Sequence, residues 1–215
     1  MENNSKKLNI TNTRNWYTWC SSYINPIVLR GELELMIDKI DTDIIEFPLF
    51  TKQFCDEIIQ LAEQNTWLTD RHGSYPTTDQ ELSTLKMNSI YQKVLEEFVY
   101  PIWKKFWDLN DQYLYLDSEN FIVKYDIHNQ GSLNLHHDGS LITMNLRLND
   151  DFEGGGTFIP KFNKVINPSE IGSIIAHPGR ITHKHGGRPV KSGTRYILIT
   201  FTKNRRLQYD LNRFV

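Results

Sequence analysis

The sequence has few of the features that mark secreted, membrane-spanning or nucleic-acid-binding proteins. Its 215 residues include only two cysteines, Cys20 and Cys55, too few for a disulfide framework and at a spacing that fits no metal or redox motif. No stretch approaches the roughly 20 apolar residues of a membrane span, and the polar segment 1–13 lacks the apolar centre of a signal peptide. The net charge is only −2, with both signs dispersed. We therefore expect a soluble chain without a secretion signal, a membrane span or a nucleic-acid partner.

The first half of the sequence has helical periodicity and the second half has strand periodicity. Residues 51–64 begin with an N-cap candidate, Thr51, and residues 89–107 form a second helical stripe that Pro101 should kink. Beyond residue 120, β-branched and aromatic residues alternate between Gly, Pro and Asn turns. The predicted strands are 121–127, 141–148, 170–177 and 195–202. Strands at this close spacing favour an antiparallel sandwich or jelly roll with an α-rich N-terminal half packed on it.

The histidines are concentrated, because six of the seven lie between residues 128 and 185. The segment SLNLHHD (132–138) places His136 and Asp138 two positions apart. On a strand, side chains two apart face the same side, so this pair could bind one ion while His137 points away. A plain polar pair is the alternative interpretation, since this spacing is common by chance.

A second histidine pair, His183 and His185, could supply a third ligand. Parity leaves both candidates open. His185 is favoured because the ten-residue step (195 − 185) to Arg195, which opens an apolar strand, suits two neighbouring strands of a barrel. His177 precedes a Pro-Gly pair, and we interpret it as a turn residue rather than a ligand.

Two imidazoles and one carboxylate on a β scaffold are the ligands of non-haem Fe(II) oxygenases. Three protein ligands leave positions open for a bidentate 2-oxo acid and O₂, whereas a closed four-ligand site would bind zinc without oxidative chemistry. The guanidinium of Arg195 can bind a carboxylate through two parallel hydrogen bonds, which suits the far carboxylate of 2-oxoglutarate. The alternative is a non-catalytic jelly-roll binding module in which the histidines are incidental.

Two weaker patterns are interpreted as structural. The run Glu153–Gly156 lacks the following Lys-Ser/Thr of a phosphate loop, and between strands it predicts a hairpin turn or a bulge. The aromatic cluster of Trp16, Tyr17 and Trp19 is predicted to pack against the core, because no basic groove accompanies it as base stacking would require.

Four long segments carry a resemblance to a known family. They are FIVKYDIHNQGSLNLHHDGSLITMNLRLN (121–149), EGGGTFIPKF (153–162), IGSIIAHPGRITHKHGG (171–187) and GTRYILITF (193–201). In this order they resemble the catalytic domain of the procollagen lysyl hydroxylases, and weaker similarity extends back through residues 75–82 and 47–58 to Trp16. The loop 149–152 is shorter than in the animal enzymes, and the tail after Asn204 does not align. The glycosyltransferase domains of larger members have no counterpart in this chain, so collagen glycosylation is not expected of it.

The resemblance implies an Fe(II)- and 2-oxoglutarate-dependent dioxygenase of the α+β class, with a double-stranded β-helix (jelly-roll) core and supporting N-terminal helices. Matched motif by motif, it implies Fe(2+) bound by His136, Asp138 and His185, so that His185 rather than His183 is the distal ligand. It also implies that Arg195 binds 2-oxoglutarate.

The remaining implications concern the pocket and the substrate. Tyr125 and Asn145 match residues that line the co-substrate pocket, and the family uses O₂ and L-ascorbate. The implied reaction is 5-hydroxylation of peptidyl lysine in collagen-like X-Lys-Gly sequences, with succinate and CO₂ as products. Asp79 and Glu153 are guesses for acidic groups that attract the lysine ammonium. A prolyl or other protein hydroxylase is the alternative, as is a nucleic-acid demethylase, which the mildly acidic balance disfavours.

The expected organisation has three parts: an N-terminal helical extension (1–44), the dioxygenase domain (45–204) and a C-terminal tail (205–215). The catalytic domains of the family that this chain resembles are dimeric, so the resemblance implies a homodimer. Family members act in the endoplasmic reticulum, whereas the Asn- and Ile-rich composition suggests a microbial or viral source.

Overall fold

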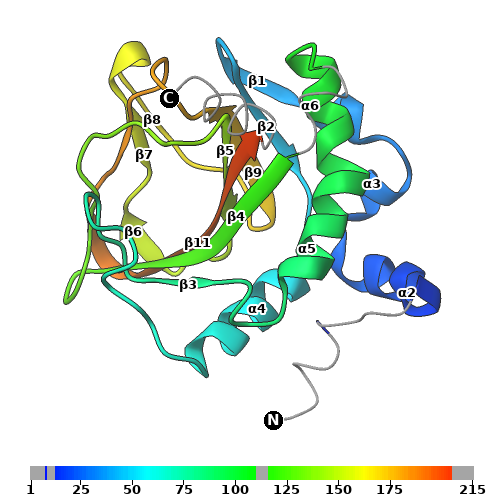
Figure 1. Cartoon of the computed structure of the whole chain (residues 1–215), viewed down its shortest axis with the longest axis horizontal. Coiled ribbons are helices and arrows are strands. Elements are labelled where there is room, and N and C mark those ends of the chain that lie inside the picture. Colours follow the sequence, from blue (N-terminus) through cyan, green and yellow to red (C-terminus); the bar gives the residue numbers. More distant parts are fainter. Residues whose placement is uncertain (1–7, 9–12, 110–115, 205–215) are drawn as a thin grey trace, which may run out of the picture.

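The computed structural model describes residue 8, residues 13–109 and residues 116–204, and it places most helices on one side of a curved β structure (Figure 1). The helical elements are α2 (Thr13–Tyr23), α3 (Pro26–Leu29), the 3-10 turn η1 (Leu33–Met36), α4 (Lys52–Glu63), α5 (Asn88–Val94), the π-helical turn η2 (Leu95–Val99), α6 (Tyr100–Phe106) and the 3-10 turn η4 (Pro160–Phe162). No helix in these ranges is long and apolar enough to cross a membrane. The expected tail, 205–215, lies outside the described residues.

The helix predicted for residues 51–64 is confirmed as α4. The Thr51 hydroxyl accepts a hydrogen bond from the backbone N–H of Phe54, as an N-cap residue does. Phe54, Ile58 and Ala62 are buried, so the helix packs one apolar stripe against the sheet.

The second predicted helix is also confirmed, and it is interrupted near Pro101. Helix α5 leads through the π-helical turn η2 into α6, whose second residue is Pro101. Proline has no N–H to donate to the preceding turn, and a wider π turn directly before it is one way for a helix to accommodate this loss.

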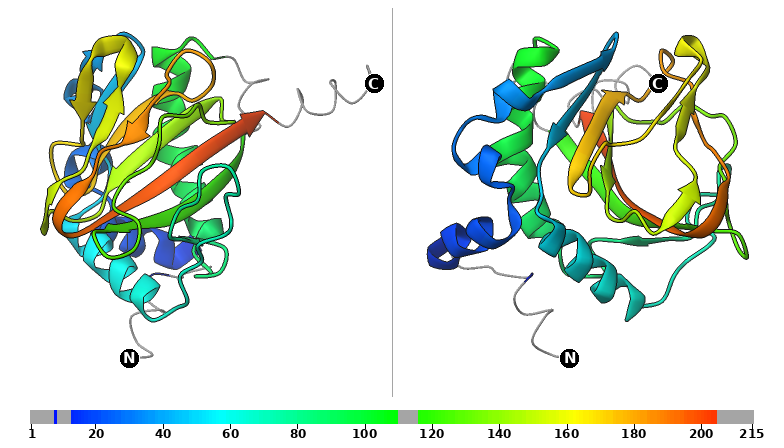
Figure 2. Two further views of the ribbon diagram at one scale, coloured as in Figure 1. Left: turned by 90° about the vertical axis from the view of Figure 1, so that its left-hand side faces the viewer. Right: turned by 180° about the vertical axis from the view of Figure 1, so that it is seen from behind.

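The strands form two antiparallel sheets that curve around a common interior (Figure 2). The strands are β1 (Asp38–Asp41), β2 (Ile44–Pro48), β3 (Asp79–Glu81), β4 (Leu116–Asp126), β5 (Ile142–Arg147), β6 (Phe152–Gly154), β7 (Thr157–Ile159), β8 (Lys164–Ile166), β9 (Ser173–Pro178), β10 (Gly186–Gly187) and β11 (Val190–Asn204). The large sheet has the order β1-β2-β9-β5-β11-β4-β3, with β6 paired to β11, and the small sheet has the order β10-β7-β8. The four predicted strands are confirmed as β4, β5, β9 and β11 with shifted ends. The α+β architecture is confirmed as well.

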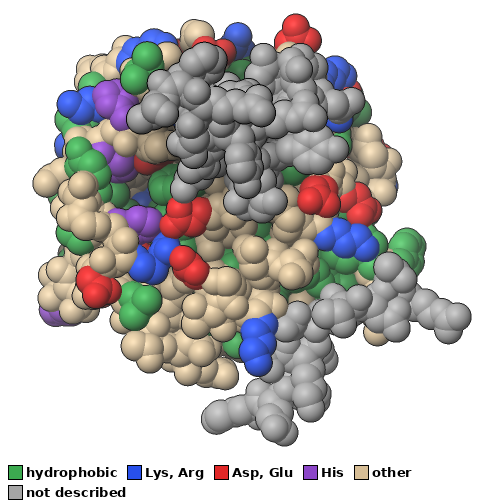
Figure 3. Space-filling model, viewed as in Figure 1, with side chains coloured by type: hydrophobic (Ala, Val, Ile, Leu, Met, Phe, Trp, Pro, Cys, Tyr) green, Lys and Arg blue, Asp and Glu red, His purple; other side chains and the backbone are tan. Residues whose placement is uncertain are grey.

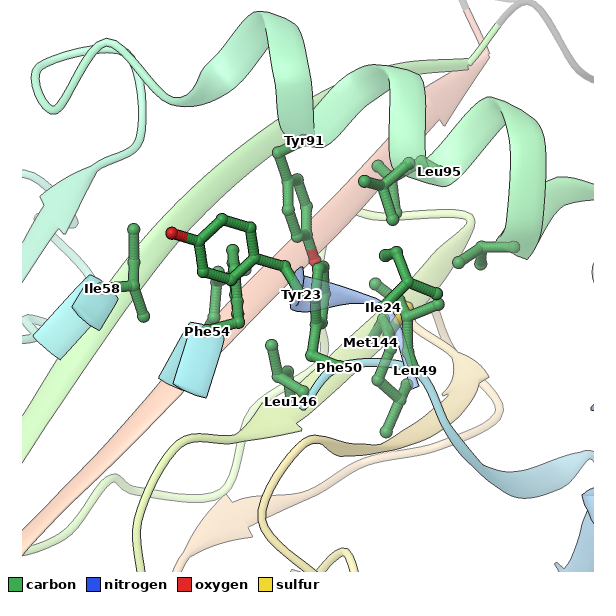
Figure 4. Close-up of a cluster of buried hydrophobic side chains, with 14 of the residues drawn as sticks. Tyr23, Ile24, Leu49, Phe50, Phe54, Ile58, Tyr91, Leu95, Met144 and Leu146 are labelled. Atoms are coloured by element: carbon green, nitrogen blue, oxygen red, sulfur yellow. The ribbon is translucent and has the colours of Figure 1, made fainter. Parts of the chain in front are cut away.

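The main core lies between the helices and the large sheet. Figure 4 shows side chains from α2, α4, α5 and β5 meeting there, among them Phe54, Tyr91 and Met144. Phe50 and Phe54 stack with ring centroids 3.9 Å apart. This apolar layer holds the helices on the outer face of the large sheet and leaves the opposite face for the site.

The aromatic cluster in α2 is only partly what the sequence predicts. Trp19 is 1% exposed, and its ring lies 5.3 Å from that of Trp16, so both contribute to packing. Tyr17 is 81% exposed, so its predicted burial is wrong. One position along a helix turns a side chain by about 100°, which points Tyr17 away from the face that its neighbours share. Cys20 and Cys55 are buried and free, consistent with small apolar side chains.

Two local segments differ from the patterns used to interpret them. Residues 132–138 form no strand, because within them only the isolated bridge between His136 and His185 has strand-like pairing. The hairpin turn predicted for the glycine run 154–156 is wrong, since β6 pairs with β11 and β7 pairs with β8 and β10. The predicted alternative, a bulge, agrees with the register shift between Val190 and Ser192 where β11 pairs with β6. All three glycines have positive φ angles, which lets the chain turn sharply from one sheet to the other.

Candidate active site

Two loops and one isolated β-bridge bring the chemical side chains together. His136 and Asp138 lie in the segment between β4 and β5, and His185 lies directly before β10. The backbones of His136 and His185 exchange hydrogen bonds of 2.8 and 2.9 Å. His136 and Asp138 are buried whereas His137 between them is exposed, so the alternation predicted for a strand holds although the segment is a loop.

The three buried side chains direct their donor atoms at one point. The Nε2 atoms of His136 and His185 lie 3.2 and 3.3 Å from the two carboxylate oxygens of Asp138. The ligand atoms of this group lie within 4.8 Å of one another, and it is the only such group of His, Cys, Asp or Glu side chains among the described residues. Two imidazoles and a carboxylate on one side of an open position fit a divalent first-row metal such as Fe(II).

Backbone carbonyls orient both imidazoles. The Nδ1 of His136 donates to the carbonyl of Asn134 at 2.7 Å, and the Nδ1 of His185 donates to the carbonyl of His183 at 2.9 Å. A histidine whose Nδ1–H is held in this way presents the Nε2 lone pair to a metal. The imidazole of His183 lies outside this group, beside the Thr42 carbonyl and the Thr182 hydroxyl.

The charges of the cluster are mutually stabilised. Burial acts to raise the pKa of Asp138, but its contacts with His136 and His185 and the hydrogen bond from Thr143 outweigh it and hold that pKa well below its usual range. Burial acts to lower the pKa of His185, but Asp138 raises it above the ordinary value. Asp138 is therefore a carboxylate at neutral pH, which is the form that binds a metal.

His177 is a strand residue, so its prediction as a turn residue is wrong. It lies in β9, is fully buried, and donates from Nδ1 to the carbonyl of Pro178 at 2.8 Å. Its ring meets the edge of the His185 ring at 5.0 Å. Burial lowers the pKa of His177 to about 3, so the ring is neutral and packs behind the cluster.

A pocket of about 400 Å³ opens beside the three side chains, and Arg195, Tyr125 and Asn145 line it together with them. Arg195 is 3% exposed, and its guanidinium donates to Oδ1 of Asn167 at 3.2 Å. It lies 5.6 Å from the ring centroid of Tyr125 and 6.0 Å from that of Phe152. Burial lowers the pKa of Arg195, because a guanidinium among aromatic rings is desolvated. A carboxylate ligand would supply the missing countercharge.

The floor of the pocket follows from the register of β11 on β4. Arg195 pairs with Tyr125, and Ile197 and Ile199 follow on the same face of β11 toward Phe121 of β4. Burial raises the pKa of Tyr125 to about 12, so its hydroxyl keeps its proton and can donate to an anion. The pocket thus has a cationic end and an apolar floor leading past His136, Asp138 and His185, the candidate metal-binding group.

The segment between α4 and β3 covers one side of this pocket, a role that the sequence analysis did not assign to it. The ring of Tyr75 lies 4.7 Å from the His136 ring. Arg71, which also lines the pocket, pairs with Asp79, Glu81 and Glu119. Figure 3 shows acidic and basic side chains beside histidines on this face.

The two acidic residues guessed to attract a lysine side chain are placed differently from that expectation. Asp79 is fully buried and already holds Arg71 and the Thr77 hydroxyl. Glu153 is exposed on β6 and is not among the described residues that line the pocket. Asn167 and Thr143 contact Arg195 and Asp138 respectively, and the sequence alone did not single them out.

Comparison with known proteins gives both sequence and fold relatives. No family model matches the chain. The human protein "Procollagen-lysine,2-oxoglutarate 5-dioxygenase 2" is 33% identical over 198 residues, which cover 85% of this chain and 26% of the human protein. The Drosophila melanogaster protein "Procollagen-lysine,2-oxoglutarate 5-dioxygenase" is 30% identical over 220 residues, covering 92% of this chain and 30% of that protein. The chain therefore spans between a quarter and a third of the length of these curated relatives.

Solved structures share the fold at low sequence identity. A 2OG-Fe(II) oxygenase-family oxidoreductase from Burkholderia pseudomallei has a TM-score of 0.58 at 13% identity, covering 77% of this chain and 87% of that one. The viral collagen prolyl hydroxylase of Paramecium Bursaria Chlorella virus-1 has a TM-score of 0.50 at 18% identity, covering 71% and 90% of the two chains. The fold is the jelly roll of the Fe(II)- and 2-oxoglutarate-dependent oxygenases, which confirms the predicted fold class.

Within that class, the sequence comparison confirms the resemblance drawn from the motifs. The chain is a homologue of the procollagen-lysine 2-oxoglutarate 5-dioxygenases.

Proposed function

We propose that the chain is a 2-oxoglutarate-dependent hydroxylase that acts on peptidyl lysine in collagen-like X-Lys-Gly sequences. The reaction would convert lysine to 5-hydroxylysine and 2-oxoglutarate to succinate and CO₂. The observation that carries the proposal is that the metal-binding group and the buried Arg195 guanidinium line one pocket. Lysine as the target residue is supported by the names of the relatives that match most of this chain.

In this proposal His136, Asp138 and His185 hold Fe(2+), which when bound supplies the chemistry that activates O₂. Their donor atoms converge from one side, and this leaves the pocket side for a co-substrate. The hydrogen bonds that both Nδ1–H groups donate to backbone carbonyls keep the imidazoles in the tautomer that a metal requires.

Arg195 binds the far carboxylate of 2-oxoglutarate in the same proposal. Its guanidinium is fixed by Asn167, and its desolvated setting strengthens an ion pair with an incoming carboxylate. The protonated hydroxyl of Tyr125 and the amide of Asn145 line the same pocket and provide further polar contacts. Holding the co-substrate in one orientation is the main contribution that the chain makes to the reaction rate.

The proposal extends to the organisation of the chain. Residues 45–204 form the dioxygenase domain, residues 1–44 an N-terminal extension and residues 205–215 a C-terminal tail. L-ascorbate serves as the reductant that keeps the iron in the ferrous state, and the protein acts as a homodimer, as the resemblance implies.

The test is product mapping by mass spectrometry. The purified chain, supplied with Fe(II), ascorbate and 2-oxoglutarate, should add one oxygen atom to the lysine of a Lys-Gly collagen peptide and release succinate. Asp138→Ala should abolish both products, and His128→Ala, which changes an exposed histidine outside the pocket, should keep them. Hydroxylation of proline in the peptide, or loss of a methyl group from methylated oligonucleotides in a parallel panel, would show that lysine is not the target. Full activity of Asp138→Ala would contradict the metal assignment.

A further inference from the structure

A second cavity, of about 540 Å³, adjoins the pocket. Two segments form its walls: residues 69–78, before β3, and residues 129–134, after β4. The residues Ser74, Tyr75, Thr77 and Leu133 line both cavities. The two cavities therefore adjoin at these four side chains.

The lining of the second cavity is polar but uncharged. Among the described residues that line it, none is an Asp, Glu, Lys, Arg or His, and most carry a hydroxyl or amide. Such groups donate and accept single hydrogen bonds, as peptide groups require. A charged ligand would find no counterion on these walls and would lose hydration without compensation.

One side chain ties the two walls together. The Oε1 of Gln130 accepts a hydrogen bond from the backbone N–H of Thr78 at 2.7 Å. Its Nε2 donates to the carbonyls of Pro76 and Ser132. The cavity is thus held open before a ligand arrives, which reduces the conformational entropy lost on binding.

Tyr75 and Asn134 connect this cavity to the metal-binding group. The ring of Tyr75 lies against the His136 ring on one side and lines the second cavity. Asn134 lines the cavity, and its carbonyl accepts the Nδ1–H of His136. A ligand seated here would lie directly next to the residues that position the reacting centre.

We infer that the second cavity binds the uncharged, extended backbone that flanks the target residue of a Gly- and Pro-rich peptide. This inference rests on the proposed function, since it assigns the substrate of the same site. An extended polyproline II segment has no internal hydrogen bonds, so its peptide groups are free to pair with hydroxyl and amide side chains. Tyr75, Pro76 and Leu133 supply apolar surface against which proline rings can pack.

The experiment measures binding directly, by fluorescence anisotropy of labelled peptides on the full chain. A longer Gly- and Pro-rich peptide with a central lysine is compared with the blocked single residue, N-acetyl-lysine amide. Ser132→Trp and Thr69→Trp place bulk on opposite walls, at positions that are exposed and tolerate substitution. Leu35→Trp adds a similar bulk to a remote, 85% exposed position and serves as the matched control.

We expect the longer peptide to bind at least about tenfold more tightly than the blocked lysine, because each flanking residue adds contacts. Both cavity variants should lose this gain, and Leu35→Trp should retain it. Unchanged affinity in both cavity variants, or no gain from the flanking residues in the unaltered chain, would overturn the inference. Cavity-dependent binding without hydroxylated lysine would contradict the proposed function and leave the inference standing. Hydroxylation of the lysine in the same peptide, with binding that neither cavity variant weakens, would support the proposed function and overturn the inference.

Discussion

The hydroxyl of Thr143 donates a hydrogen bond of 2.6 Å to Oδ2 of Asp138, and this links strand β5 to the metal-binding group. The hydroxyl of Ser140 lies 2.6 Å from that of Thr143, so the contact is part of a short buried chain. The Thr143 hydroxyl therefore fixes the orientation of the Asp138 carboxylate, and each carboxylate oxygen lies near one histidine Nε2 atom.

Thr143→Val keeps the size of the side chain and removes this donor. We expect metal affinity to fall about 10- to 100-fold, as is found when an outer-shell partner of a ligand is lost. Thr200→Val is the matched control, because the Thr200 hydroxyl is also buried but pairs with Tyr91 of α5 instead of Asp138. Anaerobic calorimetric titration with Fe(II) measures both variants. An equal loss of affinity in the two would show that Thr143 has no special role.

Gly155→Ala should weaken 2-oxoglutarate binding through Arg195. Gly155 has φ +69°, and a Cβ there would meet Cδ of Arg195 at 3.0 Å, so the Arg195 side chain would have to shift by a few tenths of an ångström. Gly31→Ala is the control, since Gly31 has φ +73° and a Cβ there meets nothing within 4 Å. Each variant carries a backbone cost of about 1–2 kcal/mol. Only Gly155→Ala should also raise the apparent KM for 2-oxoglutarate, read from succinate release, and a similar rise in both would refute the contact with Arg195.

Arg71→Met should loosen the segment that covers the pocket. The buried carboxylate of Asp79 would lose its cationic partner, which we expect to lower the free energy of unfolding by about 3–5 kcal/mol. Adding Asp79→Asn removes the unpaired charge and should restore part of the loss. Chemical denaturation measures the stability of the single and double variants, and hydrogen exchange measures opening of residues 69–78. Protection of that segment equal to the unaltered chain would be evidence against the anchoring role.

The pH dependence of stability should include a contribution from Asp126 at the end of β4. Burial acts to raise its pKa, but hydrogen bonds from the Asn129 side chain and the amides of His128 and Asn129 outweigh it and lower the pKa. A carboxyl whose pKa is depressed in the folded state stabilises that state above its unfolded pKa of about 3.9, and this contribution is lost as the pH falls through the folded pKa. Asp126→Asn should therefore be less stable than the unaltered chain at neutral pH, and the difference should vanish in acid. A difference that is constant from pH 7 to pH 2 would argue against this linkage.

The helices and strands with a periodic pattern of apolar residues could be predicted from the sequence. The apolar stripe through Phe54 and Ile58 indicates a helix, and the alternation in residues 195–202 indicates a strand, because each pattern is set by neighbouring residues. The residue types of the metal-binding group were visible for the same reason, since His136 and Asp138 are only two positions apart. The loop conformation of their backbone could not be predicted, because a single β-bridge to a segment distant in the sequence positions it.

The supporting contacts of the site could not be predicted, because they join residues far apart in the chain. Asn167 meets Arg195 across 28 positions, and Tyr75 meets His136 across 61 positions (136 − 75). No local pattern records such a contact. The guess that Asp79 attracts a substrate cation failed similarly, because its partner Arg71 comes from the covering segment. Charge in a sequence does not indicate whether a carboxylate is already paired.

The reciprocal backbone hydrogen bonds between His136 and His185 have a consequence for metal exchange. The spacing of the two imidazoles is set by peptide groups, so little chain ordering should be needed when an ion enters. Removing the metal with a chelator should then leave the loops folded, and reloading should proceed without a refolding phase. A different divalent ion would bind at the imidazole spacing that the bridge sets. Replacing one metal by another should therefore change the coordination of the ion more than the conformation of the protein.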